Sequence, residues 1–285
     1  LYAAVSSSTF GLAPFFSITL LLAGFSAFEV LSYRWGVASI VLIVFGWLSG
    51  CNFRLAGKDW GVVFLLSLLR AVTSFSLIIA YQNIASGVAS TIHFMYPLAV
   101  ALVMMFFFRE KKSLLVILAV LMSLLGAALL SLGELEAKSG NTMVGLVAAC
   151  VSVFSYAGYI VGVRTTRAVQ INSTVLTCYV MGLGTIFYLI GAYCTSGLQL
   201  VSDGYTWLII LGLALPATAI SNITLVQAIK YAGPTLTSIL GAMEPLTAVV
   251  IGVFVFKELF TVNSAVGIIL ILLAVSIVVF RRQKS

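Results

Sequence analysis

The sequence has few charged side chains. Only 8% of its 285 residues are Asp, Glu, Lys or Arg, whereas a soluble domain carries about 25%. So few charges would not cover the surface of a soluble protein of this length. Because 62% of the residues are hydrophobic, the composition favours a protein whose outer surface faces lipid. The lipid bilayer is therefore its first predicted partner.

Sequence motifs of several other protein classes are also missing. The chain has no GxxxxGK[ST] loop, which argues against an ATP-driven pump, and no GxSxG, HExxH or paired-Asp motif, so we expect no enzyme. The single histidine, His93, has no second His or Cys at ligand spacing, and the four cysteines form no CxxC. No metal and no cofactor is expected. The only basic tract is 281–284, so no nucleic-acid partner is expected.

Long apolar runs are what the sequence does have. About 20 apolar residues suffice for a helix to cross the hydrocarbon core of a bilayer. This rule predicts an all-α integral membrane protein with ten transmembrane helices. They lie near residues 1–23, 27–48, 60–81, 87–108, 113–132, 142–163, 173–195, 205–229, 233–256 and 263–280.

The basic residues are distributed unevenly between the two sets of connecting loops. Loops on one side hold eleven Lys and Arg residues, and loops on the other hold only Lys138 and Lys257. Cytoplasmic loops are the ones enriched in Lys and Arg. We therefore predict a multi-pass protein of the cell inner (plasma) membrane with both termini in the cytoplasm. A monomer is expected.

The two halves of the chain repeat one another. A shift of 148 residues places Met95-Tyr96-Pro97-Leu98 on Met243-Glu244-Pro245-Leu246, and six of the sixteen positions from residue 95 to 110 are identical. The predicted repeats are 1–137 and 138–285, with five spans each. Because five is odd, the second repeat must cross the membrane in the opposite orientation. Inverted repeats are typical of secondary transporters, whose solute site lies near the midplane between the halves.

The repeated element reads ASGVASTIHFMYPLAVALVMMFFFREK in the first half and AGPTLTSILGAMEPLTAVVIGVFVFKEL in the second. A span with a central proline, followed thirteen residues later by a basic-acidic pair, resembles the EamA-type transporters of the drug/metabolite transporter superfamily. Tyr33-Arg34-Trp35 also resembles that family's Arg-aromatic signature, although the same shift places Gly182 opposite Arg34. The resemblance implies a ten-helix carrier with a central cavity that exports or exchanges amino acids, metabolites or drugs.

These features together predict a secondary active transporter that works by alternating access around a central cavity. Two arginines and one deep glutamate within the spans suit amino acids or similar zwitterionic or anionic solutes. A multidrug transporter that exports cationic compounds is the alternative within the same class. A membrane channel and an intramembrane enzyme are alternatives from different classes.

Glu244 is the deepest predicted carboxylate. It lies about eleven residues into the ninth span, or roughly 16 Å from its start, on a stripe of small and polar residues with Thr237 and Gly241. A carboxylate at this depth suits proton coupling, or binding of an ammonium group. The alternative is a structural strut in which Glu244 is permanently paired with an arginine. Pro245, like Pro97 in the first half, predicts a helix kink.

Arg70 and Arg34 are the two arginines predicted within spans. Because Arg stays protonated, Arg70 needs an anion, which is either Glu244 or a carboxylate or phosphate of the substrate. Arg34 lies nearer a membrane face, where snorkelling or pairing with Glu29 competes with a role in substrate binding.

Aromatic side chains complete the predicted site. His93 and Tyr96 lie just before the kink in the fourth span, and Tyr156 and Tyr159 would form an aromatic wall in the sixth. A packing role is the alternative for His93, and an interfacial or packing role is the alternative for Tyr156 and Tyr159. The predicted substrate-binding residues are Arg34, Arg70, His93, Tyr96, Tyr156, Tyr159 and Glu244.

Overall fold

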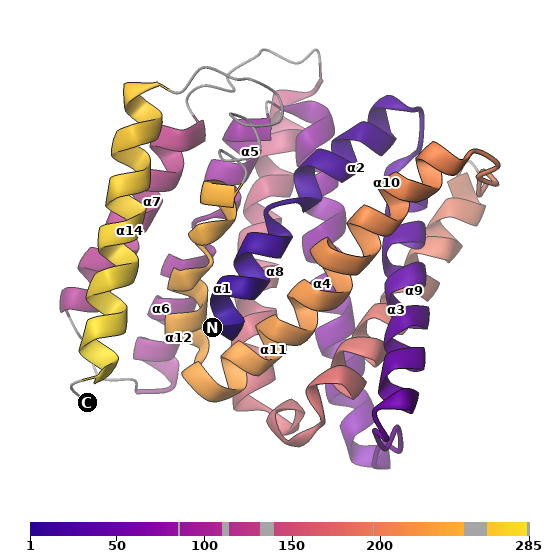
Figure 1. The fold of residues 1–285 in the computed structure, drawn as a ribbon, viewed down its shortest axis with the longest axis horizontal. Helices are drawn as coiled ribbons and strands as arrows, with labels where there is room; N and C mark the ends of the chain where they lie inside the picture. The colour runs from indigo at the N-terminus through magenta and orange to yellow at the C-terminus, as the bar shows by residue number, and fades with distance from the viewer. Residues whose placement is uncertain (85, 110–113, 132–139, 196, 248–260, 284–285) are drawn as a thin grey trace.

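The computed structural model describes residues 1–84, 86–109, 114–131, 140–195, 197–247 and 261–283, and all regular structure in these ranges is helical (Figure 1). The longer helices are α1 (Tyr2–Phe10), α2 (Ala13–Leu22), α3 (Ala27–Leu48), α4 (Trp60–Asn83), α5 (Ser86–His93), α6 (Tyr96–Phe107), α7 (Leu114–Ser131), α8 (Thr142–Thr165), α9 (Ser173–Thr195), α10 (Gly204–Ala214), α11 (Ser221–Ala232), α12 (Pro234–Leu240) and α14 (Val262–Gln283). Short elements are the 3₁₀-helices η1 (Gly57–Asp59) and η3 (Arg167–Gln170) and the π-helical turn η4 (Leu215–Ile220).

Seven helical segments within the described ranges are long and apolar enough to cross a membrane. They are Tyr2–Leu22, Ala27–Leu48, Gly57–Asn83, Val88–Phe107, Thr142–Thr165, Ser173–Thr195 and Gly204–Ala232. Two further helices, α7 and α14, contain shorter apolar stretches at Ile117–Gly126 and Ala265–Ile277. The predicted all-helical, multi-pass character is confirmed, and the number ten stays a prediction. The second part of the predicted ninth span and the 137/138 boundary between repeats lie outside the described residues.

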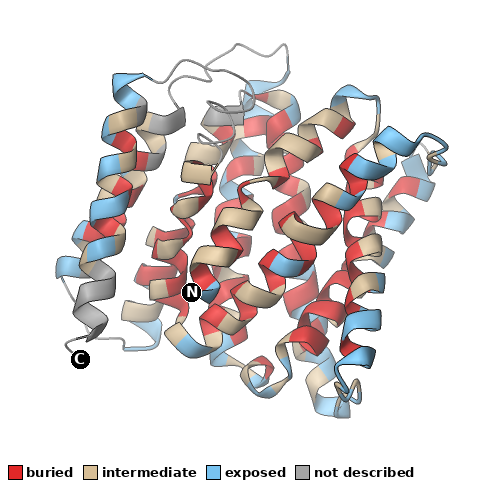
Figure 2. Cartoon of the chain, viewed as in Figure 1, coloured by how far each residue is buried: buried red, intermediate tan, exposed pale blue. Residues whose placement is uncertain are grey.

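The surface of the helix bundle is apolar. Large hydrophobic side chains are exposed on several helices, among them Ile43, Phe64, Phe107, Phe154 and Ile190. Figure 2 shows that exposed residues lie on the outer faces, whereas buried residues gather between the helices. An exposed apolar surface of this extent is unfavourable in water and favourable in lipid.

Helix pairs that are distant in the sequence hold the bundle together. α3 packs on α9 and α7 packs on α14, at opposite sides of the molecule in Figure 1. Between them α4 packs on α8, α1 packs on α11 and α6 packs on α12. These contacts join early parts of the chain to late ones, so residues far apart in the sequence meet in the interior.

The α3–α9 contact depends on a missing side chain. The ring of Trp35 lies directly against Gly184, and a Cβ atom added at Gly184 would overlap the ring. Trp35 is fully buried and meets the ring of Tyr188 edge-on, with centroids 5.1 Å apart. Small residues let membrane helices approach closely. Here the absence of a side chain at Gly184 leaves space for the indole ring of Trp35.

Four apolar helical segments are interrupted near a proline. α1 and α2 are separated by Gly11 and Leu12, and α5 and α6 by Phe94 and Met95. Proline lacks the backbone donor that helix continuity requires, so the helix breaks or widens beside it. The prolines at the four sites are Pro14 in α2, Pro97 in α6, Pro216 in η4, and Pro245 in the helical residues 243–247 that follow α12.

Candidate functional site

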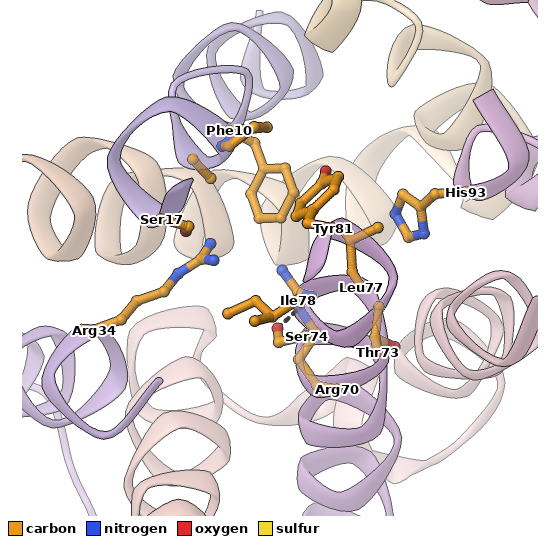
Figure 3. Close-up of a pocket in the computed structure, with 12 residues that line it drawn as sticks. Phe10, Ser17, Arg34, Arg70, Thr73, Ser74, Leu77, Ile78, Tyr81 and His93 are labelled. Carbon is orange, nitrogen blue, oxygen red and sulfur yellow. Dashed lines mark hydrogen bonds between the residues drawn. The ribbon is translucent and has the colours of Figure 1, made fainter. Parts of the chain in front are cut away.

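A small cavity lies inside the bundle, between α1, α2, α3, α4 and α5 (Figure 3). The volume available to the centre of a water molecule is about 20 Å³, which holds one or two waters. A solute the size of an amino acid needs more room, so the cavity is too small to hold one in this conformation. The lining residues are Phe10, Ala13, Pro14, Ser17, Arg34, Arg70, Thr73, Ser74, Leu77, Ile78, Tyr81 and His93.

Arg34 and Arg70 both line this cavity, and their side chains converge on it from α3 and α4 (Figure 3). Only 5% of Arg34 and 1% of Arg70 is exposed. Their Cζ atoms lie 5.4 Å and 5.2 Å from the centre of one ring, that of Phe10. A cation within about 6 Å of an aromatic ring is attracted to its face. Phe10 is therefore a shared contact of two buried cations.

The remaining contacts of Arg70 are with neutral groups. Its Nε donates to Oδ1 of Asn222 at 3.1 Å, and Nη1 donates to Oγ of Ser74 at 3.4 Å. Its Cζ lies 4.9 Å from the ring centre of Tyr156 and 5.9 Å from that of Tyr159. The hydrogen bond to Asn222 in α11 connects the two predicted halves of the chain.

Arg34 is held by the π-helical turn η4. Its Nε donates to Oγ1 of Thr218 at 2.6 Å, and Nη2 donates to the carbonyl oxygen of Ala217 at 3.3 Å. The hydroxyl of Thr218 in turn donates to the carbonyl of Leu213, five residues earlier, at 2.7 Å. π-Helical turns inside α-helices are frequent at functional sites. Here the turn, which contains Pro216, presents two acceptors to a buried arginine.

The alternative in which Arg34 pairs with Glu29 is wrong. The Glu29 carboxylate accepts from the backbone N–H of Ser26 at 2.8 Å and from that of Gln199 at 2.7 Å. Glu29 thereby completes a capping box at the start of α3 and attaches the connection before α10 to it. Since both carboxylate oxygens accept from backbone N–H groups, Glu29 stabilises the end of the helix. Arg34 instead donates its hydrogen bonds to η4.

Four predicted aromatic residues form one buried cluster beside Arg70. The ring centre of His93 lies 5.4 Å from that of Tyr96 and 5.4 Å from that of Tyr156. Tyr96 and Tyr156 are 4.6 Å apart, and Tyr156 and Tyr159 are 6.5 Å apart. These separations are typical of favourable aromatic pairs. α5, α6 and α8 thus supply a continuous aromatic wall next to a buried cation.

The hydrogen bonds of His93 indicate its tautomer. Its Nδ1 lies 2.9 Å from Oγ of Ser152, whose hydroxyl is directed at the carbonyl of Ala149 at 2.6 Å. A hydroxyl has one proton to donate, so Ser152 accepts from Nδ1–H of His93. In a neutral ring, Nε2 is then the acceptor. His93 therefore brings a hydrogen-bond acceptor to the lining of the cavity.

Glu244 is buried near the same cluster. Its carboxyl group interacts electrostatically with Arg70 and with the hydroxyls of Tyr96 and Tyr156. Among the residues that the structure describes, Arg70 has no carboxylate within 4.0 Å, and its hydrogen bonds go to Asn222 and Ser74. The alternative of a strut in which Arg70 and Glu244 are permanently paired is therefore absent from this conformation.

The buried hydroxyl of Tyr159, beside the site, lacks a hydrogen-bond partner among the described residues. This hydroxyl is shielded from solvent, and the ring of Tyr159 faces Arg70. A buried polar group without a partner costs free energy, so such a group in a native protein calls for an explanation. A solute that supplied the missing hydrogen bond would account for this hydroxyl.

Comparison with known proteins now decides the family. A family model described as "EamA-like transporter family" matches residues 1–132 and again residues 143–280. The chain belongs to the EamA-like transporter family. It is thus a membrane transporter of the drug/metabolite transporter superfamily, as the repeated proline motif indicated, and a small-molecule solute and the lipid bilayer are its partners.

The fold of this EamA-like transporter is also found in a solved crystal structure of a protein. That structure matches with a TM-score of 0.81 at 18% sequence identity, over 100% of this chain and 96% of the other. Identity at this level demonstrates a shared fold. No curated protein matches the chain.

Three residues of the site in this EamA-like transporter were missed from the sequence. Thr218 and Asn222 could have been found by extending the repeat, because a shift of 148 residues places them on Arg70 and Ser74. Arg70 and Ser74 in α4 thus occupy positions of the repeat equivalent to those of Thr218 in η4 and Asn222 in α11. Phe10 carried no comparable signal, since it is one of 19 phenylalanines. Within the described part of the chain, no three His, Cys, Asp or Glu side chains gather as metal ligands would.

Proposed function

We propose that this protein is a secondary active exporter or exchanger of small zwitterionic or anionic metabolites, amino acids foremost among them. The observation that carries the proposal is the pair of buried guanidinium groups that share the ring of Phe10. A charge buried without a counter-ion is strongly unfavourable. Transient binding of an anionic solute would relieve that cost, and release would restore it.

Within this proposal, Arg70 binds the carboxylate of the solute. A guanidinium binds a carboxylate through two parallel hydrogen bonds, which gives direction as well as affinity. Glu244 binds the ammonium group, or a proton when the solute lacks one. His93, Tyr96, Tyr156 and Tyr159 enclose the organic part of the solute, and Arg34 contributes from the other side of Phe10.

We propose ten transmembrane helices in two inverted five-helix repeats, 1–137 and 138–285. The contact pattern of the described helices supports this arrangement. A shift of 148 residues exchanges α3 with α9 and α7 with α14, and each of these helices packs on its own counterpart. It also relates the α4–α8 contact to the α11–α1 contact, as a pseudo-two-fold axis in the membrane plane requires.

Transport then proceeds by alternating access to the cavity of Figure 3. The small cavity volume fits a conformation closed to both sides, and the interruptions near Pro14, Pro97, Pro216 and Pro245 supply points at which helices bend. The proposed membrane is the cell inner (plasma) membrane, with both termini cytoplasmic and the chain acting as a monomer.

A flux screen in proteoliposomes tests this function. The full chain is reconstituted, and uptake of labelled amino acids, organic anions, sugar phosphates and cationic drugs is measured with and without a pH gradient. Saturable flux and counterflow of an amino acid or organic anion are expected. Preferential flux of cationic drugs would instead establish the multidrug alternative. Non-saturable flux without counterflow would indicate a channel, and chemical conversion of the solute would indicate an enzyme.

A further inference from the structure

The buried charges near the cavity do not balance. Of the eight acidic residues in the sequence, Glu29, Asp59, Asp203 and Glu244 lie in the described ranges. Glu29 is bound to backbone N–H groups, Asp203 caps α10, and Asp59 precedes α4. Of these four, Glu244 is the one with an electrostatic interaction with a cavity arginine, and that arginine is Arg70. Glu29 and Glu244 are both buried, but Glu29 is bound to backbone N–H groups, so Glu244 is the one buried carboxyl group of the described residues that is left to balance the two buried arginines.

This imbalance limits the charge of the solute. A neutral amino acid between Arg70 and Glu244 would satisfy its own two charges and leave Arg34 without a counter-ion. A second anionic group on the solute would neutralise Arg34 as well. With Glu244 ionised, a solute with one ammonium and two carboxylates makes the site neutral.

Both guanidinium groups also retain hydrogen bonds to give. Arg34 uses Nε and one N–H of Nη2 on η4, and Arg70 uses Nε and one N–H of Nη1 on Asn222 and Ser74. Each has five N–H donors. Three donors per arginine therefore stay available in the described contacts, enough for a two-pronged interaction with a carboxylate.

The positions of the two arginines suit one solute rather than two. Both Cζ atoms lie within 5.4 Å of the ring centre of Phe10, so they are at most twice that distance apart. The two groups face the same cavity (Figure 3). Thr218 and Asn222 hold their Nε atoms from α11 and its preceding turn. The fold thereby keeps two like charges close together, an arrangement that favours a ligand with two anionic groups.

We infer that Arg34 and Arg70 are two anion subsites for a single solute, and that the transported class is the acidic amino acids, which carry one ammonium and two carboxylate groups. This inference rests on the proposed transport function and names its substrate class. Arg70 and Glu244 bind the amino-acid group, and Arg34 binds the side-chain carboxylate. Arg34 is then the residue that distinguishes an acid from its amide.

Counterflow measurements in proteoliposomes test the inference. Counterflow of L-glutamate and L-aspartate is compared with that of L-glutamine and L-asparagine, which have the same shape without the second charge, and with succinate, which lacks the ammonium group. The acids are expected to have a KM lower than their amides by about tenfold or more, the effect of one charged buried hydrogen bond. Arg34→Gln should remove most of this preference, and Arg54→Gln, at an exposed position, should keep it.

A second variant covers the case in which Arg34→Gln does not fold. Thr218→Ala removes the acceptor of Arg34 Nε, and it should reduce the acid-to-amide preference by a smaller factor.

Equal KM values for glutamate and glutamine in the wild type would overturn the inference while leaving the transport function intact. An unchanged preference in Arg34→Gln would overturn it too. Succinate flux at the glutamate KM would support the two anion subsites and overturn the ammonium role. Failure to move any solute would overturn the proposed function itself.

Discussion

The hydroxyl of Tyr96 lies against the α-carbon of Gly241, at the crossing of the two repeated proline motifs. A Cβ atom added at Gly241 would overlap this hydroxyl and approach the Tyr96 ring carbon that bears it to 2.9 Å. Gly241 is the counterpart of His93 in the other half, because 148 residues separate them. At this position of the repeat the first half therefore has the ring of His93, whereas the second half has a glycine, and the missing side chain of Gly241 leaves room for Tyr96.

Gly241→Ala should displace Tyr96 from the aromatic cluster. We expect the free energy of unfolding to fall by about 1–3 kcal/mol, as for other overpacked interiors, and the KM to rise with it. Tyr96→Phe in the same chain should recover part of the loss, because the overlapping oxygen is gone. Thermal unfolding in detergent and counterflow measure the two effects. Gly182→Ala is the matched control, since no atom lies within 4 Å of the added carbon. Equal stability of the two alanine variants would contradict this packing.

Glu244→Gln should abolish accumulation driven by a pH gradient. The amide keeps the size of the side chain and loses the proton-binding group, whereas counterflow exchange needs no net proton movement and should fall less. Uptake with and without the gradient separates the two activities. Asp59→Asn, near the start of α4, serves as a control that also removes one carboxylate. Gradient-driven accumulation at the wild-type level in Glu244→Gln would remove this residue from coupling.

Arg70→Lys should weaken solute binding although it preserves the charge. An ammonium group cannot form the two parallel hydrogen bonds of a guanidinium, nor reach Asn222 and Ser74 in the same geometry. We expect a KM about tenfold higher or more, the effect of losing one charged hydrogen bond. Asn222→Ala should reproduce a smaller part of this change, because it removes only the acceptor of Nε. A KM for Arg70→Lys equal to that of the wild type would show that charge alone suffices.

Glu29→Ala should reduce stability and leave substrate selectivity unaltered. It removes the acceptor for the backbone N–H groups of Ser26, at the start of α3, and of Gln199, before α10, and a lost helix cap costs about 1–2 kcal/mol. Glu29→Gln keeps an acceptor oxygen and should lose less. Thermal unfolding gives the stability, and the glutamate-to-glutamine KM ratio gives the selectivity. A changed ratio in Glu29→Ala would mean that this carboxylate compensates the charge of Arg34 after all.

Cysteine labelling tests the orientation of the chain. In a background without the four natural cysteines, Lys138→Cys and Ser285→Cys should react with a membrane-impermeant reagent from opposite sides. Asn52→Cys, on an exposed loop predicted to be cytoplasmic, should label from the same side as Ser285→Cys. Labelling of positions 138 and 285 from one side would contradict the inverted arrangement of the halves.

Local patterns in the sequence were enough to predict the membrane character of the chain. A run of about 20 apolar residues predicts a spanning helix wherever it docks, because lipid accepts apolar side chains on every face. Seven of the ten predicted spans are matched by helices of the required length in the described ranges. The few ionisable side chains within the predicted spans selected Arg34, Arg70, His93 and Glu244, all of which are buried. An ionisable side chain within a span must lie inside the bundle.

Which side chains meet was decided only by the tertiary structure. Glu29 is close to Arg34 in sequence, yet it binds the backbone of Gln199, and Arg34 binds Thr218. Both partners lie more than 160 residues along the chain, on elements that approach α3 only when the helices dock. Hydrophobic periodicity indicates which face of a helix is buried. It does not determine which polar group of a neighbouring helix that face will contact. The partners of buried charges depend on helix contacts and on local departures such as the π-helical turn η4, so they emerge with the packed fold.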